Sequence, residues 1–115
     1  KDPTIAVRDC LAEIEVLRAI AASMTFAAFR DDPIARRAAA FAIQTISEAV
    51  RKIPTPWLAD FPDQPWSQIR GIGNRLRHEY YRIDDAILWQ VMTSDIEPLG
   101  AAMKALLEKH GPPMT

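Results

Sequence analysis

Apolar residues recur at the spacing of an amphipathic helix near the start of the chain. They are Ile5, Leu11, Ile14, Leu17 and Ala21. Asp2 and Pro3 precede this pattern and form a helix-start signal, because an Asp side chain caps the first N–H groups and proline fits the first turn. We therefore predict a helix over residues 3–25.

A second helix is predicted over residues 33–52 on the same grounds. Asp32 and Pro33 supply the start signal, and four apolar residues share one face of the segment that follows. They are Ala39, Ile43, Ile46 and Val50. Because the connection between the two helices is short, we expect them to pack as an antiparallel pair.

Prolines dominate the next segment, residues 53–65. They are Pro54, Pro56, Pro62 and Pro65. This number of prolines argues against a helix, and the segment has too few strand formers for a sheet, so we predict a long connecting loop. Trp57, Leu58 and Phe61 indicate that the loop packs back against the helices.

Pro65 and Trp66 open a third predicted helix, which runs through about His78. Its buried side carries Trp66, Ile69, Ile72 and Leu76. Gly71 and Gly73 interrupt this helix, and each costs about 1 kcal/mol relative to alanine. They indicate either a close approach by another part of the molecule or a ligand, or simple tolerance.

Asp84 is placed to cap a fourth helix, and Ser94 with Glu97 has the spacing of a capping box that restarts a helix to about Lys109. Pro98 then lies in the first turn, where proline is tolerated. No segment alternates between apolar and polar residues as a strand does. The sequence therefore predicts an all-α, up-down bundle of four to five helices in a single domain over residues 1–115.

Composition narrows the possible functions. Hydrophobic residues make up 49% of the chain, charged residues 25%, and the formal net charge is -1, so any contact with nucleic acid must come from a local cluster. The densest such cluster is Arg70, Arg75, Arg77 and Arg82. There is no apolar run of membrane-spanning length and no signal-peptide pattern, and the single cysteine, Cys10, lies in an apolar pattern. We expect a cytoplasmic protein that neither spans nor binds a membrane.

The third predicted helix carries the residues best suited to phosphate chemistry. Arg70, Asn74 and His78 are four residues apart, so they drift by only about 80° and share one stripe, with Arg77 at its edge. Cleavage of RNA without a metal needs a proton acceptor, a proton donor and a cation. Imidazole and guanidinium groups supply these. The single imidazole of this stripe is few for such a reaction, which is a physical reason to expect a homodimer that supplies two copies of His78.

Simpler explanations exist for each of these residues. A single histidine near a helix end often caps carbonyl groups, and nearby arginines often pair with acidic residues such as Glu79 or Asp84. Tyr80 is more typical of a half-buried aromatic residue than of a reactive one, and His110 is typical of a frayed terminus. The histidine and cysteine spacing matches no metal-ligand pattern, so we expect no metal or other cofactor.

Four segments together resemble the HepT-like branch of the HEPN superfamily, over nearly the whole chain. Ile46–Ala49 resembles its "GEA" region, Pro65–Ile69 its P-W-x-x-I helix start, and Asp84–Trp89 the segment that follows its motif. Residues 74–80 resemble the R-N-x-L-x-H-x-Y signature, in which Asn74, His78 and Tyr80 match. The motif arginine falls on Gly73.

This resemblance implies a metal-independent endoribonuclease toxin that works as a homodimer. It further implies a nucleotidyltransferase antitoxin that silences the toxin by transferring AMP to Tyr80. In this reading His78 acts as acid and base, Asn74 positions the phosphate, and Arg70 or Arg77 stabilises its charge, while Arg75 and Arg82 contact RNA.

Two other readings stay open. In the first, the chain is a catalytically weak binding module that docks a nucleotidyltransferase or RNA, because Gly73 replaces the motif arginine. In the second, it is a purely structural dimerisation bundle, in which Arg70, Asn74 and His78 point to solvent in separate directions.

Overall fold

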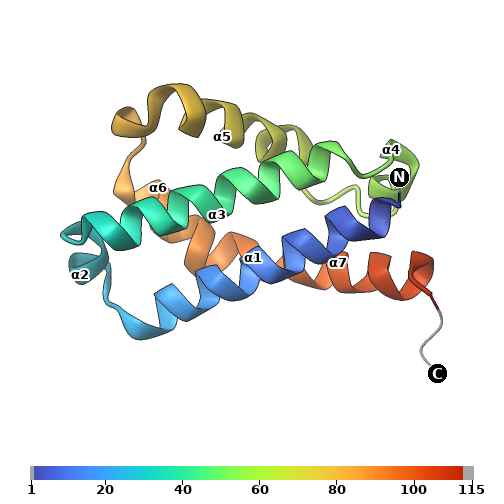
Figure 1. The fold of residues 1–115 in the computed structure, drawn as a ribbon, viewed down its shortest axis with the longest axis horizontal. Helices are drawn as coiled ribbons and strands as arrows, with labels where there is room; N and C mark the ends of the chain where they lie inside the picture. The colour runs from blue at the N-terminus through green and yellow to red at the C-terminus, as the bar shows by residue number, and fades with distance from the viewer. Residues whose placement is uncertain (1, 113–115) are drawn as a thin grey trace.

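Four long helices form an up-down bundle in the computed structural model, which describes residues 2–112 (Figure 1). They are α1 (Pro3–Ser23), α3 (Pro33–Arg51), α5 (Trp66–Glu79) and α7 (Ile96–His110). Successive long helices run in opposite directions along the long axis of the molecule. The described residues contain no strand. The all-α fold and the antiparallel pairing of the first two predicted helices are therefore confirmed.

Shorter helical segments join the long ones. They are α2 (Phe26–Arg30), α4 (Thr55–Leu58), a 3₁₀ turn η1 (Tyr80–Arg82), α6 (Asp85–Gln90) and a π-helical turn η2 (Val91–Asp95). The turn η2 runs directly from α6 into α7, so the chain makes no loop there. These connections place α5 at one edge of the bundle, where it packs on α3 (Figure 1).

Aspartate caps begin three helices where the sequence predicts them. Asp2 accepts a hydrogen bond from the Thr4 N–H at 2.9 Å, and Asp32 accepts from the N–H groups of Ile34 and Ala35. Asp84 caps α6 through the Ala86 N–H at 2.9 Å. In the first two cases proline follows the cap and occupies the first turn, where its missing N–H costs nothing.

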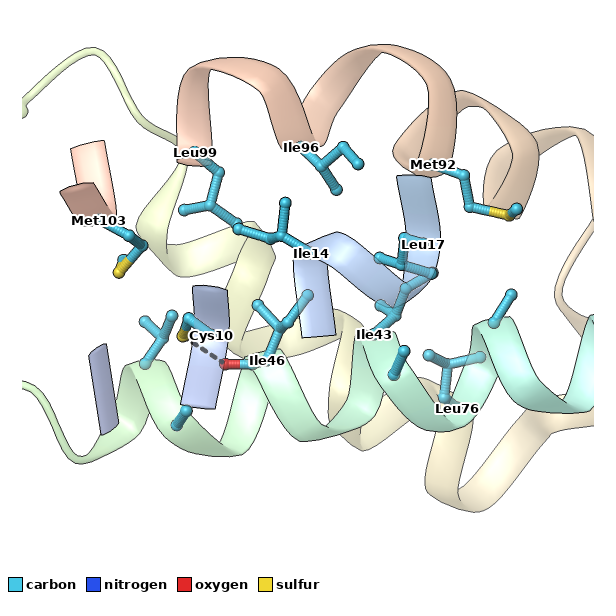
Figure 2. Close-up of a cluster of buried hydrophobic side chains, with 14 of the residues drawn as sticks. Cys10, Ile14, Leu17, Ile43, Ile46, Leu76, Met92, Ile96, Leu99 and Met103 are labelled. Carbon is cyan, nitrogen blue, oxygen red and sulfur yellow. Dashed lines mark hydrogen bonds between the residues drawn. The ribbon is translucent and has the colours of Figure 1, made fainter. Parts of the chain in front are cut away.

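One hydrophobic core joins the long helices. Figure 2 shows its centre, where Cys10, Ile14 and Leu17 of α1 face Ile43 and Ile46 of α3. The other labelled residues come from α5, η2 and α7. They are Leu76, Met92, Ile96, Leu99 and Met103. Cys10 is fully buried and its thiol donates to the Ile46 carbonyl at 3.8 Å. Burial raises the pKa of the Cys10 thiol to about 12, so this thiol is a packing group.

Two short helices, α2 and α4, were not predicted. The first helix ends at Ser23, because Thr25 begins α2 by accepting a hydrogen bond from the Ala28 N–H at 3.1 Å. The Pro-rich segment contains the short helix α4, which has proline in its first turn. The expectation that this segment packs back is confirmed, since Leu58 is buried and Trp57 and Phe61 pack against the core.

The predicted capping box at Ser94 was also wrong. The backbone does not restart there, because η2 continues into α7 without a side-chain cap. The Glu97 carboxylate instead accepts hydrogen bonds from Arg18 of α1 at 3.0 and 3.1 Å, so it ties α7 to α1. Pro98 lies in the first turn of α7, as predicted.

The C-terminal end of α7 is tied to the Pro-rich segment rather than frayed. The His110 ring stacks on Trp57 with centroids 3.7 Å apart, and Lys109 pairs with Asp60 at 2.8 Å. None of the described helices is long and apolar enough to cross a membrane.

Candidate functional site

The helix α5 carries the residues that the sequence singles out. It runs without interruption from Trp66 to Glu79, so Arg70, Asn74 and His78 lie one above another; we call these three residues the α5 stripe. Asn74 and His78 are exposed and Arg70 is half-buried. Arg70 and His78 are about 12 Å apart along the axis, because each residue adds 1.5 Å. They could act together only through a group that bridges them.

The position that the motif arginine would occupy holds Gly73, which packs against α3. Gly73 is buried against α3, and a Cβ atom there would lie 2.3 Å from the Ser47 Oγ and 2.5 Å from the Ser47 Cβ. Both distances are far below van der Waals contact, so residue 73 has no room for a side chain. Gly71 differs, since a Cβ atom there meets nothing within 4 Å. Close approach by another part of the molecule, one of the explanations for these glycines, therefore holds for Gly73 and not for Gly71.

The contact at Gly73 also fixes how α5 is rotated on α3. The Ser47 hydroxyl donates to the Arg70 carbonyl at 2.9 Å, and the Arg51 guanidinium donates to the same oxygen at 2.9 Å. Leu76, buried on the same side of α5, completes this contact. With that side held against α3, the α5 stripe is left on the open side of the helix.

Arg77 links the α5 stripe to α3 through two hydrogen bonds. Its Nη1 donates to the Glu48 carboxylate at 2.8 Å and its Nη2 donates to the Asn74 Oδ1 at 3.1 Å. Glu48 comes from α3, so this contact joins the two helices beside the stripe. The side chains of Arg77 and Glu48 are each about two-fifths exposed, which leaves the guanidinium accessible. The structure thus brings Arg77 and Asn74 together.

Sequence reasoning did not find Glu48 as a site residue. It lies 29 positions before Arg77, and its place next to Ser47 in the "GEA" region was the only available signal. Its partnership with Arg77 depends on how α3 and α5 pack.

The remaining groups of the α5 stripe are available to a ligand. Within residues 2–112, neither the His78 imidazole nor the Arg70 guanidinium makes a hydrogen bond or an ion pair. The structure does not join either group directly to Arg77. A phosphodiester, which carries several acceptor oxygens, is the kind of group that would connect them.

The four arginines predicted as one cluster do not share one surface. Arg75 lies at a cavity of about 830 Å³ between α5 and the α6–α7 segment, and it is 200° around the helix from Arg77. Arg82 is exposed on η1, beyond the end of α5. Arg70 and Arg77 are therefore the two guanidinium groups next to Asn74, and an RNA contact by Arg75 or Arg82 stays a prediction.

Two tyrosines follow the site, and their surroundings differ. Tyr80 is half-buried and packs against the core, whereas Tyr81 is 91% exposed. Their rings meet edge to face with centroids 5.4 Å apart. Tyr80, the residue that matches the family motif, is thus the better fixed of the two.

The described residues include no group of three or more His, Cys, Asp or Glu side chains placed to hold a metal ion. Apart from the Glu48 carboxylate, which is paired with Arg77, the site groups around Asn74 are guanidinium, amide and imidazole groups, all of which can donate hydrogen bonds to an anion. The site is therefore suited to an anionic ligand.

Comparison with known proteins agrees with this chemistry. The family model described as "Ribonuclease HepT-like" matches residues 10–106. A relative from Caldanaerobacter subterraneus subsp. tengcongensis that carries the name of a candidate RNase is 29% identical over 110 residues, which cover 96% of this chain and 98% of the relative. A "Probable ribonuclease HepT" from Thermococcus cleftensis is 26% identical over 100 residues, covering 87% and 91% of the two chains.

No solved structure gave a significant match. The family match extends from α1 through most of α7 and includes all of α3 and α5, the two helices that build the site. On this evidence the chain belongs to the HepT-like ribonuclease family.

Proposed function

We propose that this protein is a metal-independent endoribonuclease whose site is the exposed side of α5. The observation that carries the proposal is the hydrogen bond from Arg77 to Asn74. Asn74 lies one turn before the exposed His78, and Arg77 directly precedes that histidine. Family membership supports the same activity. The alternative of a purely structural bundle is less well supported, because Arg77 and Asn74 converge.

Each of these residues has a role in cleavage. His78 takes the proton from the ribose 2′-hydroxyl, and an imidazole returns a proton to the leaving 5′-oxygen, so that a 2′,3′-cyclic phosphate forms. Arg77 stabilises the negative charge that develops on the phosphate oxygens, and Asn74 donates a hydrogen bond to one of them. Arg70, one turn earlier, is placed to hold the neighbouring phosphate.

The proposed working form is a homodimer, because each chain supplies a single imidazole, that of His78, to the site, and cleavage needs both an acid and a base. Two exposed apolar residues of α3 support pairing: Ile34 is 81% exposed and Phe41 is 68% exposed. These two residues and Glu48 are seven positions apart, so they lie on one face. A second copy that covers this face would bring its own α5 near the first. Phe41→Glu should then yield monomers in sedimentation and lose cleavage.

Regulation by AMP transfer is the finer part of the proposal. A nucleotidyltransferase antitoxin would join the α-phosphate of ATP to the Tyr80 phenol oxygen and release pyrophosphate, which places a bulky anion beside His78. Tyr80→Phe should prevent a mass increase by one AMP and preserve RNA cleavage in the presence of the antitoxin. Tyr81→Phe is the matched control, and modification that persists in Tyr80→Phe but not in Tyr81→Phe would reassign the acceptor.

Cleavage of RNA in EDTA tests the activity itself. The wild-type protein should cut RNA without added metal, and His78→Ala should lose cutting by at least about a hundredfold with unchanged helical content. Full cleavage by His78→Ala would rule out the mechanism.

A second function, favoured by Gly73, is a catalytically weak module that binds a nucleotidyltransferase or RNA. Packing against Ser47 excludes an arginine side chain at position 73. The chain would then be a weak binding module if Arg77 does not replace the missing guanidinium. A wild-type protein that cuts no RNA but forms a stable complex with a nucleotidyltransferase encoded beside it would select this function.

A further inference from the structure

The contact between Glu48 and Arg77 bears on how the site is organised. Both residues are exposed enough that their ion pair adds only about 0.2–1 kcal/mol to stability. A similar pair, Arg18 with Glu97, joins α1 to α7 far from the α5 stripe. The Glu48 pair differs because its guanidinium also donates to Asn74.

The chemistry of the donors fixes which way the Asn74 amide points. A guanidinium has five N–H donors and no acceptor, so only the oxygen of an asparagine amide can face it. The 3.1 Å hydrogen bond from Arg77 Nη2 to Asn74 Oδ1 therefore turns the NH₂ group of Asn74 away from Arg77. That NH₂ group carries two donors, and a phosphate oxygen is an acceptor.

Glu48 in turn fixes Arg77. Without a partner, an arginine on an exposed helix face samples many rotamers. The carboxylate of Glu48, anchored on α3 next to the buried Ser47, holds Nη1 at 2.8 Å and leaves Nη2 directed at Asn74. Two of the five N–H donors are used in this way, and three remain for a phosphate.

We infer that Glu48 is a positioning residue which, through Arg77, aims the NH₂ group of Asn74 at the phosphate of the substrate. The inference rests on the proposed ribonuclease function for its catalytic consequence. Glu48 itself touches no reacting atom. Its negative charge weakens phosphate binding in the ground state, while the orientation that it imposes favours the transition state.

The Asn74 amide gives a direct readout, because it is the only asparagine in the chain. Labelling with ¹⁵N-asparagine should give one pair of side-chain NH₂ signals. Glu48→Gln should shift this pair part of the way toward its position in Arg77→Ala, because loss of the carboxylate charge loosens Arg77, whereas Arg77→Ala removes the hydrogen bond to the amide. Glu97→Gln is the matched control: it breaks the other interhelical Arg–Glu pair and should leave the Asn74 signals in place.

Kinetics test the catalytic consequence. Glu48→Gln should lower kcat for RNA cleavage by between about tenfold and a hundredfold without raising KM, and Glu48→Asp should retain more activity than Glu48→Gln. A merely structural loss would instead lower the melting temperature. Once Arg77 is alanine, Glu48→Gln should have no further effect on kcat.

The outcomes separate this inference from the proposed function. Asn74 signals that do not move in Glu48→Gln overturn the inference whether or not the protein cuts RNA. Signals that move with kcat unchanged show that the orientation has no catalytic role, which also overturns it. A wild-type protein that cuts no RNA overturns the proposed function, and a titration with inorganic phosphate then decides the inference. At saturating phosphate, a smaller shift of the Asn74 NH₂ signals in Glu48→Gln than in wild type supports the inference, and an equal shift overturns it.

Discussion

The two sides of α5 differ in their surroundings. The side that faces α3 is closed: Gly73 leaves no room for a Cβ atom against Ser47, and Leu76 is buried. The opposite side is open, with Asn74 and His78 exposed and Arg77 held beside them by hydrogen bonds. The motif arginine of the family falls on the closed side here. A guanidinium can therefore reach the site only from another position on α5, and Arg77 is the arginine that hydrogen-bonds to Asn74.

The largest expected effect on stability comes from the closed side. Leu76→Ala should lower the free energy of unfolding by about 2–5 kcal/mol, because it leaves a cavity between α5 and α3. Asn74→Ala, on the open side, should change it by less than about 0.5 kcal/mol. Urea unfolding of both variants checks this. Equal losses would show that the two sides of α5 are not distinct.

The second prediction compares the effects of alanine at Gly73 and at Gly71 on stability. Gly73→Ala should lower the free energy of unfolding by about 1–3 kcal/mol, because its Cβ atom would overlap Ser47 and α5 must shift. Gly71→Ala should raise it by up to about 1 kcal/mol, since the position is open and alanine is the better helix former. Thermal unfolding of the two variants measures this, and a stabilising Gly73→Ala would contradict the packing described here.

A smaller effect is expected at the hydroxyl of Ser47. Ser47→Ala removes the donor to the Arg70 carbonyl and should cost about 1 kcal/mol. Arg51 still donates to the same oxygen, so the carbonyl keeps a side-chain donor and the loss stays small. Chemical denaturation of Ser47→Ala, with Arg51→Ala and the double variant alongside, checks whether the two donors share this role. If they do, the double variant should lose more stability than the sum of the two single losses. A double variant whose loss equals that sum would contradict a shared role.

The sequence was sufficient for the helices of the bundle, because local signals specify them. Asp2, Asp32 and Asp84 cap helices where predicted. The apolar periodicity identified most of the buried positions, but Ile5, the first residue of the predicted apolar pattern, is 58% exposed. The errors arose where local signals compete. Thr25 caps the short helix α2, which the sequence did not predict, and Glu97 pairs with Arg18 of α1 instead of closing a capping box. The partner of Glu97 lies 79 positions away, which no local pattern reveals.

The candidate site was predicted in its residues but not in its arrangement. The repeat of Arg70, Asn74 and His78 follows from helix geometry. The sequence could not decide between Arg70 and Arg77 as the cation, because the choice depends on Glu48 from another helix. Gly73 presented the same difficulty: its helix cost was evident, but the contact with Ser47 appears only when α5 packs on α3.

Cleavage kinetics of Arg77→Ala and Arg75→Ala, measured side by side in EDTA, test the central claim most directly. The two arginines are two positions apart on α5, but only Arg77 lies beside Asn74. Arg77→Ala should lower kcat by about a hundredfold or more, as loss of a transition-state donor does, while Arg75→Ala should act mainly on KM. An Arg77→Ala variant with the kcat of the wild type would contradict the claim that Arg77 supplies the guanidinium that Gly73 excludes.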